Sequence, residues 1–216
     1  MFIVNKKSNS LSAEAYRGIK TNLEYSSVDK KLKTIVITST EPAEGKSTVC
    51  GNLAYVLSQS GKKVLIIDAD LRKPSLHRKF KITNDIGLTD ILVGKVNCIG
   101  AINNIDKNID LITSGQKTPN PAEMVSSEYM EKLLEEYKKH YDYILIDTPP
   151  VLTINDGRIL AAKCDGTIFV TKAGQAKKNN ILNAYKELER VNANVVGSIL
   201  NGVQDNSKGY YYYYGS

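Results

Sequence analysis

Residues 33–48, KTIVITSTEPAEGKST, contain the most specific chemistry in the sequence. An apolar, β-branched run at 35–37 leads into a loop that ends in Gly45, Lys46 and Ser47, and an apolar helical stripe follows. In such a segment, backbone N–H groups point at nucleotide phosphates, the lysine reaches the β- and γ-phosphates, and the serine hydroxyl binds Mg²⁺. The segment therefore predicts a phosphate site made of Pro42, Ala43, Glu44, Gly45, Lys46, Ser47 and Thr48.

Acidic residues follow two other apolar runs. The run at 64–67 is followed by Asp68, Asp70 and Arg72, and the run at 143–146 is followed by Asp147 and two prolines. Ligands of open α/β sheets bind beyond the carboxyl ends of the strands, where these side chains would stand beside the loop. A strand-end acid such as Asp147 can hold Mg²⁺, directly or through water. The combination predicts a site for a nucleotide with Mg²⁺.

The elements that must position these residues alternate along the chain. Apolar runs predict strands at 35–37, 64–67, 111–113, 143–146, 166–171 and 195–200. Periodicity and caps predict helices at 11–26, 87–93, 127–137, 155–162 and 179–192, and another that starts at Pro121. Strands alternating with helices form βαβ units, so we expect an α/β fold with a doubly wound, mostly parallel sheet and helices on both faces.

We expect a single domain over residues 1–205 and a flexible tail over residues 206–216. Residues 1–10 are polar and are expected to be loose, with Ser12 as the N-cap of the first helix. Cys50, Cys98 and Cys164 have no metal-ligand spacing and are expected to be reduced core residues of a cytosolic protein. No stretch is long and apolar enough to span a membrane, so a membrane role would require a partner.

The distribution of charge along the sequence argues against a nucleic-acid-binding protein. The 216 residues carry a net charge of +6, but the 29 Lys and Arg residues form no run of five or more. Glu14, Arg17 and Lys20 are three residues apart and share one helix face, for which a solvated charged surface is the simplest interpretation. The tyrosines at the end of the chain are Tyr210, Tyr211, Tyr212, Tyr213 and Tyr214, and alone they would suit a disordered end or a platform for stacking bases.

Taken together, these motifs resemble one family, the bacterial tyrosine kinases that act as cytoplasmic catalytic subunits of Gram-positive capsule and exopolysaccharide systems. The resemblance covers nearly the whole chain. Its segments are the face of Glu14, Arg17 and Lys20, PAEGKS at 42–47, DADLR at 68–72, GLTDILVG at 87–94, SGQKTPNPAEM at 114–124, IDTPP at 146–150 and the terminal tyrosines. The chain departs from the family at Lys20 and Lys172, where Arg is usual, and at Thr40 and Ala43, where Gly often occurs.

The resemblance implies a P-loop protein-tyrosine kinase that uses ATP and Mg²⁺ and phosphorylates Tyr210–Tyr214 of a neighbouring copy. A tyrosine hydroxyl must lose its proton as the phosphoryl group arrives, and Asp68 is the first candidate to accept it. Asp70 and Asp147 would then hold Mg²⁺ together with Ser47, and Lys46 and Arg72 would offset the charge of the transferred group. The order within the three acids stays open.

The same resemblance implies partners. The face of Glu14, Arg17 and Lys20 would join unphosphorylated copies into a ring, which loosens once the tail is phosphorylated. A transmembrane activator of the polysaccharide co-polymerase type would recruit the chain to the inner face of the plasma membrane, and a cognate tyrosine phosphatase would reverse the modification. The outcome would be control of capsular or extracellular polysaccharide synthesis and export.

Two other functions are compatible with the motifs. The first is an ATPase switch of the septum-positioning and partition type, whose loop carries a second lysine where this chain has Glu41. The second is a nucleotide-binding scaffold of a membrane polysaccharide complex with little turnover. The intact Lys46 and the three acids favour an enzyme over the scaffold, and the terminal tyrosines favour a kinase over the switch.

Overall fold

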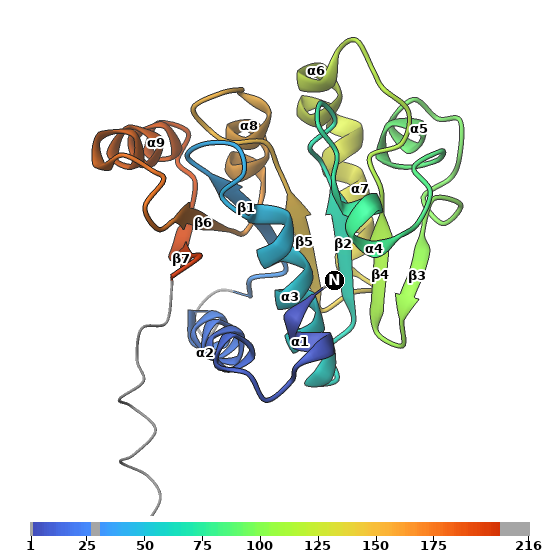
Figure 1. Ribbon diagram of the computed structural model, residues 1–216. Helices are drawn as coiled ribbons and strands as arrows, with labels where there is room; N and C mark the ends of the chain where they lie inside the picture. The colour runs from blue at the N-terminus through green and yellow to red at the C-terminus, as the bar shows by residue number, and fades with distance from the viewer. Residues whose placement is uncertain (1, 27–30, 204–216) are drawn as a thin grey trace, which may run out of the picture.

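The structure, a computed structural model, describes residues 2–26 and 31–203, which form a three-layer α/β fold (Figure 1). Its sheet has seven strands in the order β3-β4-β2-β5-β1-β6-β7. All neighbouring strands are parallel except β3 and β4, which form an antiparallel pair. The strands are β1 (Thr34–Ser39), β2 (Val64–Asp68), β3 (Asn103–Asp106), β4 (Ile109–Ile112), β5 (Tyr143–Asp147), β6 (Gly166–Lys172) and β7 (Val195–Asn201). The predicted doubly wound, mostly parallel sheet is confirmed.

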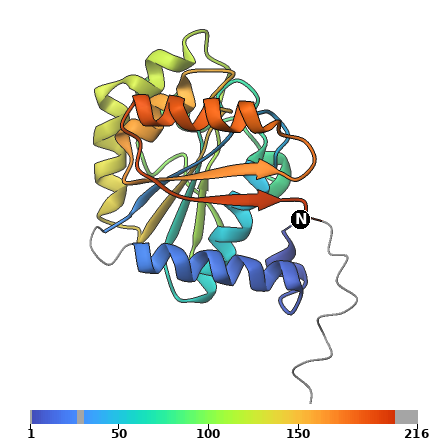
Figure 2. The same ribbon diagram turned by 90° about the vertical axis from the view of Figure 1, so that its left-hand side faces the viewer.

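Helices cover both faces of the sheet. Figure 2 shows the two outer layers edge-on, with α9 on one side of β6 and β7 and α2 on the other. The first layer consists of α1 (Ile3–Lys6), α2 (Leu11–Ser26), α3 (Lys46–Gln59) and α4 (Leu76–Phe80). The second consists of α5 (Leu88–Leu92), α6 (Pro121–Ser126), α7 (Glu128–Lys138), α8 (Asp156–Lys163) and α9 (Lys178–Arg190).

Side chains of the strands alternate between the two faces of the sheet, so the hydrophobic core is divided into two parts, one under each helical layer. In β1, Ile35 and Ile37 pack on the side of α1–α4, whereas Val36 packs on the side of α5–α9. All three side chains have an exposed fraction of 0%. Successive side chains of a strand point to opposite faces, so a central strand with helices on both sides buries both sets of side chains and reads as a nearly continuous apolar run. This explains why the uninterrupted apolar runs predict the central strands correctly.

The start of the chain corrects one expectation. Residues 3–6 form α1, and Phe2 and Val4 belong to the hydrophobic core, so residues 1–10 as a whole are not a loose polar segment. Phe2 fits against Gly51 of α3, where an added Cβ would lie 2.1 Å from the Phe2 ring. Its ring also packs against Phe80 at a centroid distance of 4.5 Å. Three apolar residues among polar neighbours are too few to show a period, which is why the sequence pattern missed this element.

Two local predictions also differ from the structure. Ser10, not Ser12, caps α2, because the Ser10 hydroxyl accepts a hydrogen bond from the Ala13 N–H at 3.2 Å. The strand β3 was not expected, since its sequence, Asn-Asn-Ile-Asp, has only one apolar residue. It extends the sheet at one edge as an antiparallel partner of β4.

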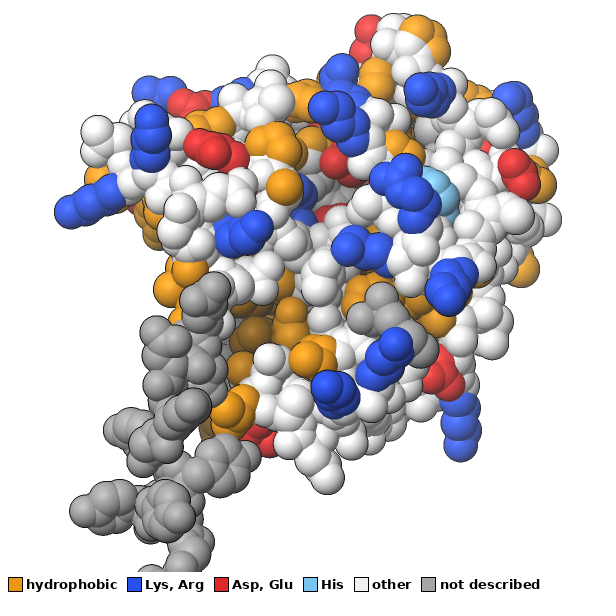
Figure 3. All heavy atoms as spheres, viewed as in Figure 1, with side chains coloured by type: hydrophobic (Ala, Val, Ile, Leu, Met, Phe, Trp, Pro, Cys, Tyr) orange, Lys and Arg blue, Asp and Glu red, His pale blue; other side chains and the backbone are white. Residues whose placement is uncertain are grey.

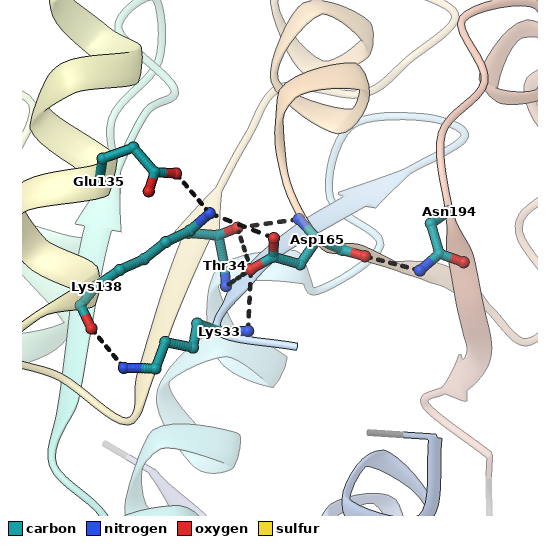
Figure 4. Close-up of polar contacts among 6 residues, drawn as sticks. All are labelled: Lys33, Thr34, Glu135, Lys138, Asp165 and Asn194. Atoms are coloured by element: carbon teal, nitrogen blue, oxygen red, sulfur yellow. Dashed lines mark hydrogen bonds and ion pairs between the residues drawn. The ribbon is translucent and has the colours of Figure 1, made fainter. Parts of the chain in front are cut away.

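The amino end of the sheet is tied together around Asp165, in the turn between α8 and β6 (Figure 4). Its carboxylate accepts hydrogen bonds from the backbone N–H of Lys33 at 3.0 Å and of Thr34 at 2.8 Å, and from the Thr34 hydroxyl at 2.9 Å. Lys138 of α7 adds an ion pair at 3.3 Å, and the Asn194 amide donates to the Asp165 carbonyl. Partial burial acts to raise the pKa of Asp165, but the hydrogen bonds from Thr34 and Lys33 lower it below the ordinary value.

Two features bear on membranes and on the end of the chain. No helix within residues 2–26 and 31–203 combines the length and the apolar character needed to cross a bilayer. The tail predicted at residues 206–216, with Tyr210–Tyr214, lies outside the described residues. The structure therefore leaves the predicted role of these tyrosines as a prediction.

Candidate active site

The predicted chemical residues meet at the carboxyl edge of the sheet. Asp68 ends β2 and Asp147 ends β5, and the two are register partners in adjacent strands. Asp147 is also paired with Ile37 of β1, the strand that leads into the loop of residues 42–48. α3 begins at Lys46, within the last three residues of this loop. The parallel register thus brings segments about 100 residues apart in sequence to one place, as the strand-end rule predicts.

A cavity of about 480 Å³ opens at this edge. Figure 3 shows a hollow on this face, with acidic side chains inside it and lysine and arginine side chains around it. The predicted residues Asp70 and Arg72 line it, and so do six of the seven predicted loop residues: Pro42, Ala43, Gly45, Lys46, Ser47 and Thr48. Pro149 and Pro150 of the IDTPP segment also line it, and further lining residues that the motifs did not indicate are Lys73, Ser75, Lys79, Thr153 and Ile154.

The loop is shaped by contacts behind it. The Glu44 side chain does not line the cavity but is fully buried, and its carboxylate accepts the N–H groups of Glu41 at 2.8 Å and of Lys172 at 3.3 Å. Gly45 has a φ of +100°, a conformation that favours glycine. A Cβ there would lie 2.0 Å from the Asn201 amide nitrogen, which donates to the Glu44 carbonyl. Glu44 was predicted as a phosphate-site residue, but its side chain braces the loop from the protein interior.

The buried carboxylate of Asp147 has an acceptor oxygen that a bound cation could use. Asp147 is 2% exposed, and its Oδ1 has no hydrogen-bond partner within the described part of the chain. Burial raises the pKa of Asp147, although the charge of Lys46 and the hydroxyl of Ser47 act to lower it. An unpaired buried carboxylate oxygen beside a serine hydroxyl is the donor set expected for Mg²⁺ at a phosphate loop. The residues present therefore fit this cation.

The remaining ligands of such a cation must come from outside the protein chain. Within residues 2–26 and 31–203, no group of three or more His, Cys, Asp or Glu residues could hold a metal ion. Ser47 and Asp147 alone do not complete the six oxygen ligands that Mg²⁺ demands. Phosphate oxygens and water would supply the rest if a metal–nucleotide complex bound here.

The structure separates the two acids that follow β2. Asp68 is fully buried, and its carboxylate accepts the N–H groups of Ser75 at 3.1 Å, of Leu76 at 3.0 Å and of Asp70 at 3.3 Å. Burial and the nearby Asp147 raise the pKa of Asp68. Asp70 lines the cavity instead. Exposure therefore favours Asp70 over Asp68 as the carboxylate that can meet a substrate.

Arg72 has a partner that the motifs did not reveal. Its guanidinium contacts both carboxylate oxygens of Asp156, with Nε at 2.9 Å from Oδ2 and Nη2 at 3.3 Å from Oδ1. Asp156 is fully buried at the first position of α8, and the two residues are 84 apart in sequence. A bidentate pair of this kind fixes the direction of the guanidinium. Asp156 thus holds Arg72 at the cavity wall.

The face predicted for assembly lies on α2, away from the cavity. Glu14 and Arg17 form an ion pair with each other. Lys20 turns toward its own molecule, where its Nζ lies 3.0 Å from the Ser60 hydroxyl and 3.6 Å from the Glu24 carboxylate. Only Glu14 and Arg17 therefore keep side chains more than one third exposed, at 71% and 37%.

Comparisons with known proteins agree with this geometry. Residues 32–200 match the family described as "AAA domain". Tyrosine-protein kinase YwqD of Bacillus subtilis (strain 168) is 43% identical over 208 residues, which cover 96% of this chain and 88% of that protein. Tyrosine-protein kinase CpsD of Streptococcus agalactiae is 37% identical, covering 89% of this chain and 84% of that protein.

Solved structures extend the similarity to the whole fold. The kinase domain of Escherichia coli tyrosine kinase ETK matches with a TM-score of 0.92 at 33% identity, covering 99% of this chain and 84% of that one. The septum site-determining protein MinD from Pyrococcus horikoshii OT3, solved with Mg-ADP, matches with a TM-score of 0.66 at 25% identity, covering 78% and 69%. The chain therefore belongs to the AAA domain family and to the bacterial tyrosine-protein kinases.

Proposed function

We propose that this protein is an ATP-dependent protein-tyrosine kinase that phosphorylates its own C-terminal tyrosines and thereby regulates the synthesis and export of capsular or extracellular polysaccharide. The observation that carries the proposal is one cavity lined by Lys46, Ser47, Asp70 and Arg72, beside the buried Asp147, whose Oδ1 has no hydrogen-bond partner among the described residues. Identity of 43% to a tyrosine-protein kinase over nearly the whole chain supports the choice of a kinase over an ATPase switch.

ATP would bind with its phosphates over the loop of residues 42–48, where backbone N–H groups and Lys46 offset their charge. Ser47 and Asp147 would hold Mg²⁺, which, when bound, neutralises charge on the phosphate oxygens. Arg72, held in direction by Asp156, would stabilise the charge that develops on the transferred group. Lys46, Mg²⁺ and Arg72 would all act where negative charge grows in the transition state, which is the condition for a gain in rate.

The acceptor is a tyrosine hydroxyl with an ordinary pKa of about 10, so it must lose its proton as the new O–P bond forms. The phosphoryl group leaves ADP, and the proton passes from the tyrosine to a carboxylate. We assign this proton to Asp70, because Asp70 lines the cavity whereas the carboxylate of Asp68, the first candidate, is buried against the backbone of α4. Asp68 then acts by positioning the segment that follows it.

The substrate tyrosines would be Tyr210–Tyr214 of a neighbouring copy, in a ring that forms through the α2 face and loosens on phosphorylation. Each phosphotyrosine adds about −1.5 to −2 charges, which repel the acids and the nucleotide phosphates at the site. A transmembrane activator would recruit the chain to the inner face of the plasma membrane, and a tyrosine phosphatase would reset the tail.

The test is to incubate the purified chain with Mg-ATP and to map phosphate by mass spectrometry. We expect phosphate on Tyr210–Tyr214, at a rate that rises with protein concentration, and none on a chain that ends at residue 205. Mixing the Lys46→Met full-length chain with the active, tail-deleted chain separates the two routes: phosphate on the Lys46→Met tail requires transfer between copies. ADP release without any phosphotyrosine would instead indicate an ATPase switch.

A further inference from the structure

We propose that Lys79 is a further nucleotide-binding residue, whose ammonium contacts the phosphates that ADP and ATP share. This inference rests on the proposed function, because it assumes that the cavity binds a nucleotide. Lys79 lies in α4, outside every motif that the sequence indicated. It lines the cavity, and its Nζ lies 2.9 Å from the hydroxyl of Thr48, a residue of the phosphate loop.

The ammonium of Lys79 is not neutralised by a direct ion pair among the described residues, although its charge acts on the buried Asp147 and favours a lower pKa there. Within residues 2–26 and 31–203 Lys79 forms no ion pair, and its one hydrogen bond goes to the neutral hydroxyl of Thr48. An ammonium group has three donors, and a partly buried one needs acceptors or a counter-charge. Arg72 on the same wall differs, because it already faces Asp156. An anion bound in the cavity would therefore supply the acceptors and the negative charge that the Lys79 ammonium needs.

Both ends of α4 are fixed, so Lys79 has a defined place. At the start of the helix, the Asp68 carboxylate accepts the N–H groups of Ser75 and Leu76. At its end, the Phe80 ring packs against Phe2 with a centroid distance of 4.5 Å. Preorganisation of this kind lowers the entropy that a long side chain loses on binding. The backbone of Lys79 is thus held in the cavity wall from both ends of its helix.

The position of Thr48 indicates which phosphates are involved. Lys46 and Ser47 open α3 and serve the terminal phosphates and Mg²⁺. Thr48 comes one residue later in α3, and we infer that it would face the next phosphate along the chain, toward the nucleoside. The loop of residues 42–48 contains a single cation, Lys46. Lys79 would add a second cation for the phosphates present in both ADP and ATP.

The test compares Lys79→Gln with Lys81→Gln, which removes the same charge from an exposed residue two positions away that does not line the cavity. Affinities of the full chain for Mg-ADP and for adenosine are measured by calorimetry. We expect Lys79→Gln to weaken ADP binding about 10-fold, as for the loss of a charge-assisted hydrogen bond. Adenosine binding should not change, and Lys81→Gln should match the wild type. Lys79→Arg should restore most of the ADP affinity.

Equal ADP affinities in Lys79→Gln and Lys81→Gln, with a wild type that binds ADP, would overturn this inference and leave the proposed function intact. A parallel loss of ADP and adenosine binding would also overturn it, because it would indicate a distorted cavity. If Lys79→Gln does not fold, Lys79→Met keeps the aliphatic stem and replaces it. Failure of the wild type to bind Mg-ADP at all would overturn the proposed function as well.

Discussion

Two carboxylate sites, one partly and one fully buried, lie at opposite ends of the same sheet. At the amino end, Asp165 accepts hydrogen bonds from the backbone of Lys33 and Thr34 and pairs with Lys138 (Figure 4). At the carboxyl end, Asp68 and Asp147 face each other across adjacent strands, and Asp147 Oδ1 has no partner in the described chain. The surroundings lower the pKa of Asp165 and raise the pKa of the other two.

The opposite pKa shifts distinguish the two sites: the site at Asp165 stabilises the fold, whereas the site at Asp147 is arranged to bind a ligand. Asp165 finds all of its partners inside the protein, so its negative charge stabilises the folded state. Asp147 keeps an acceptor oxygen free beside Ser47, so its charge costs stability until a cation arrives. A carboxylate buried without a partner is unfavourable in isolation, and its presence indicates that a bound group completes it.

Lys46→Met tests the carboxyl end with the largest expected effect. Lys46 contacts phosphate in the proposed mechanism, so tail phosphorylation should fall by at least about 100-fold, which phosphotyrosine-specific detection would measure. The unfolding midpoint should stay close to that of the wild type. Lys107→Met, an exposed lysine in the turn between β3 and β4, should leave both quantities unchanged. Normal phosphorylation in Lys46→Met would remove the cavity from the mechanism.

Asp165→Ala tests the amino end. It leaves the N–H groups of Lys33 and Thr34 without their acceptor, so the free energy of unfolding should drop by about 2 to 4 kcal/mol. Denaturant unfolding measures this change. The specific activity of the protein that remains folded should match the wild type, because Asp165 lies at the far end of the sheet. Asp85→Ala, at an exposed acid, is the control and should change neither quantity.

Asp147→Asn should give the opposite result, with a smaller change in stability. Removing a buried charge should raise the free energy of unfolding by about 1 to 2 kcal/mol at neutral pH, although kinase activity is lost. Mg-ADP should raise the unfolding midpoint of the wild type more than that of the variant. A variant less stable than the wild type without ligand would contradict the assignment of Asp147 as an unpaired acid.

The pH dependence of this gain follows from the direction of the pKa shift. The pKa of Asp147 is higher in the folded than in the unfolded state, so the folded state binds more protons and wild-type stability falls as pH rises above about 4. The advantage of Asp147→Asn should therefore be absent at low pH and grow toward neutral pH. Asp85→Asn should show no such trend. Unfolding curves at several pH values without Mg²⁺ provide the measurement.

The sequence was enough to predict those parts of the fold and of the site that short motifs or repeated apolar runs encode. The loop that ends in Lys46 follows an apolar strand directly, and Asp68 and Asp147 each follow another, so the edge of the sheet could be predicted from short segments. Asp156 and Lys79 could not be predicted in this way. Each acts on a residue far away in sequence, Arg72 or Thr48, and neither stands in a motif that reports the contact.

Other errors came from patterns too short to carry a period. Phe2 and Val4 belong to the core although polar residues surround their segment, and β3 has a single apolar residue. Contacts with neighbouring elements stabilise these two segments, whereas the intrinsic helix or strand propensity of their residues does not predict them. The choice between Asp68 and Asp70 as the proton acceptor stays a prediction, and it depends on a different kind of information. Asp68 and Asp70 are two residues apart, and only the fold shows that one is buried and the other lines the cavity.

The contact between Phe2 and Gly51 couples the residues that two positions far apart in sequence can accept. An alanine at position 51 would place its methyl group within the volume of the Phe2 ring, since an added Cβ lies 2.1 Å from it. With the Phe2 ring in this place, only glycine fits at position 51 without a shift of the ring. As related sequences diverge, we expect these two positions to change together: a relative with alanine at 51 should carry a smaller residue at 2.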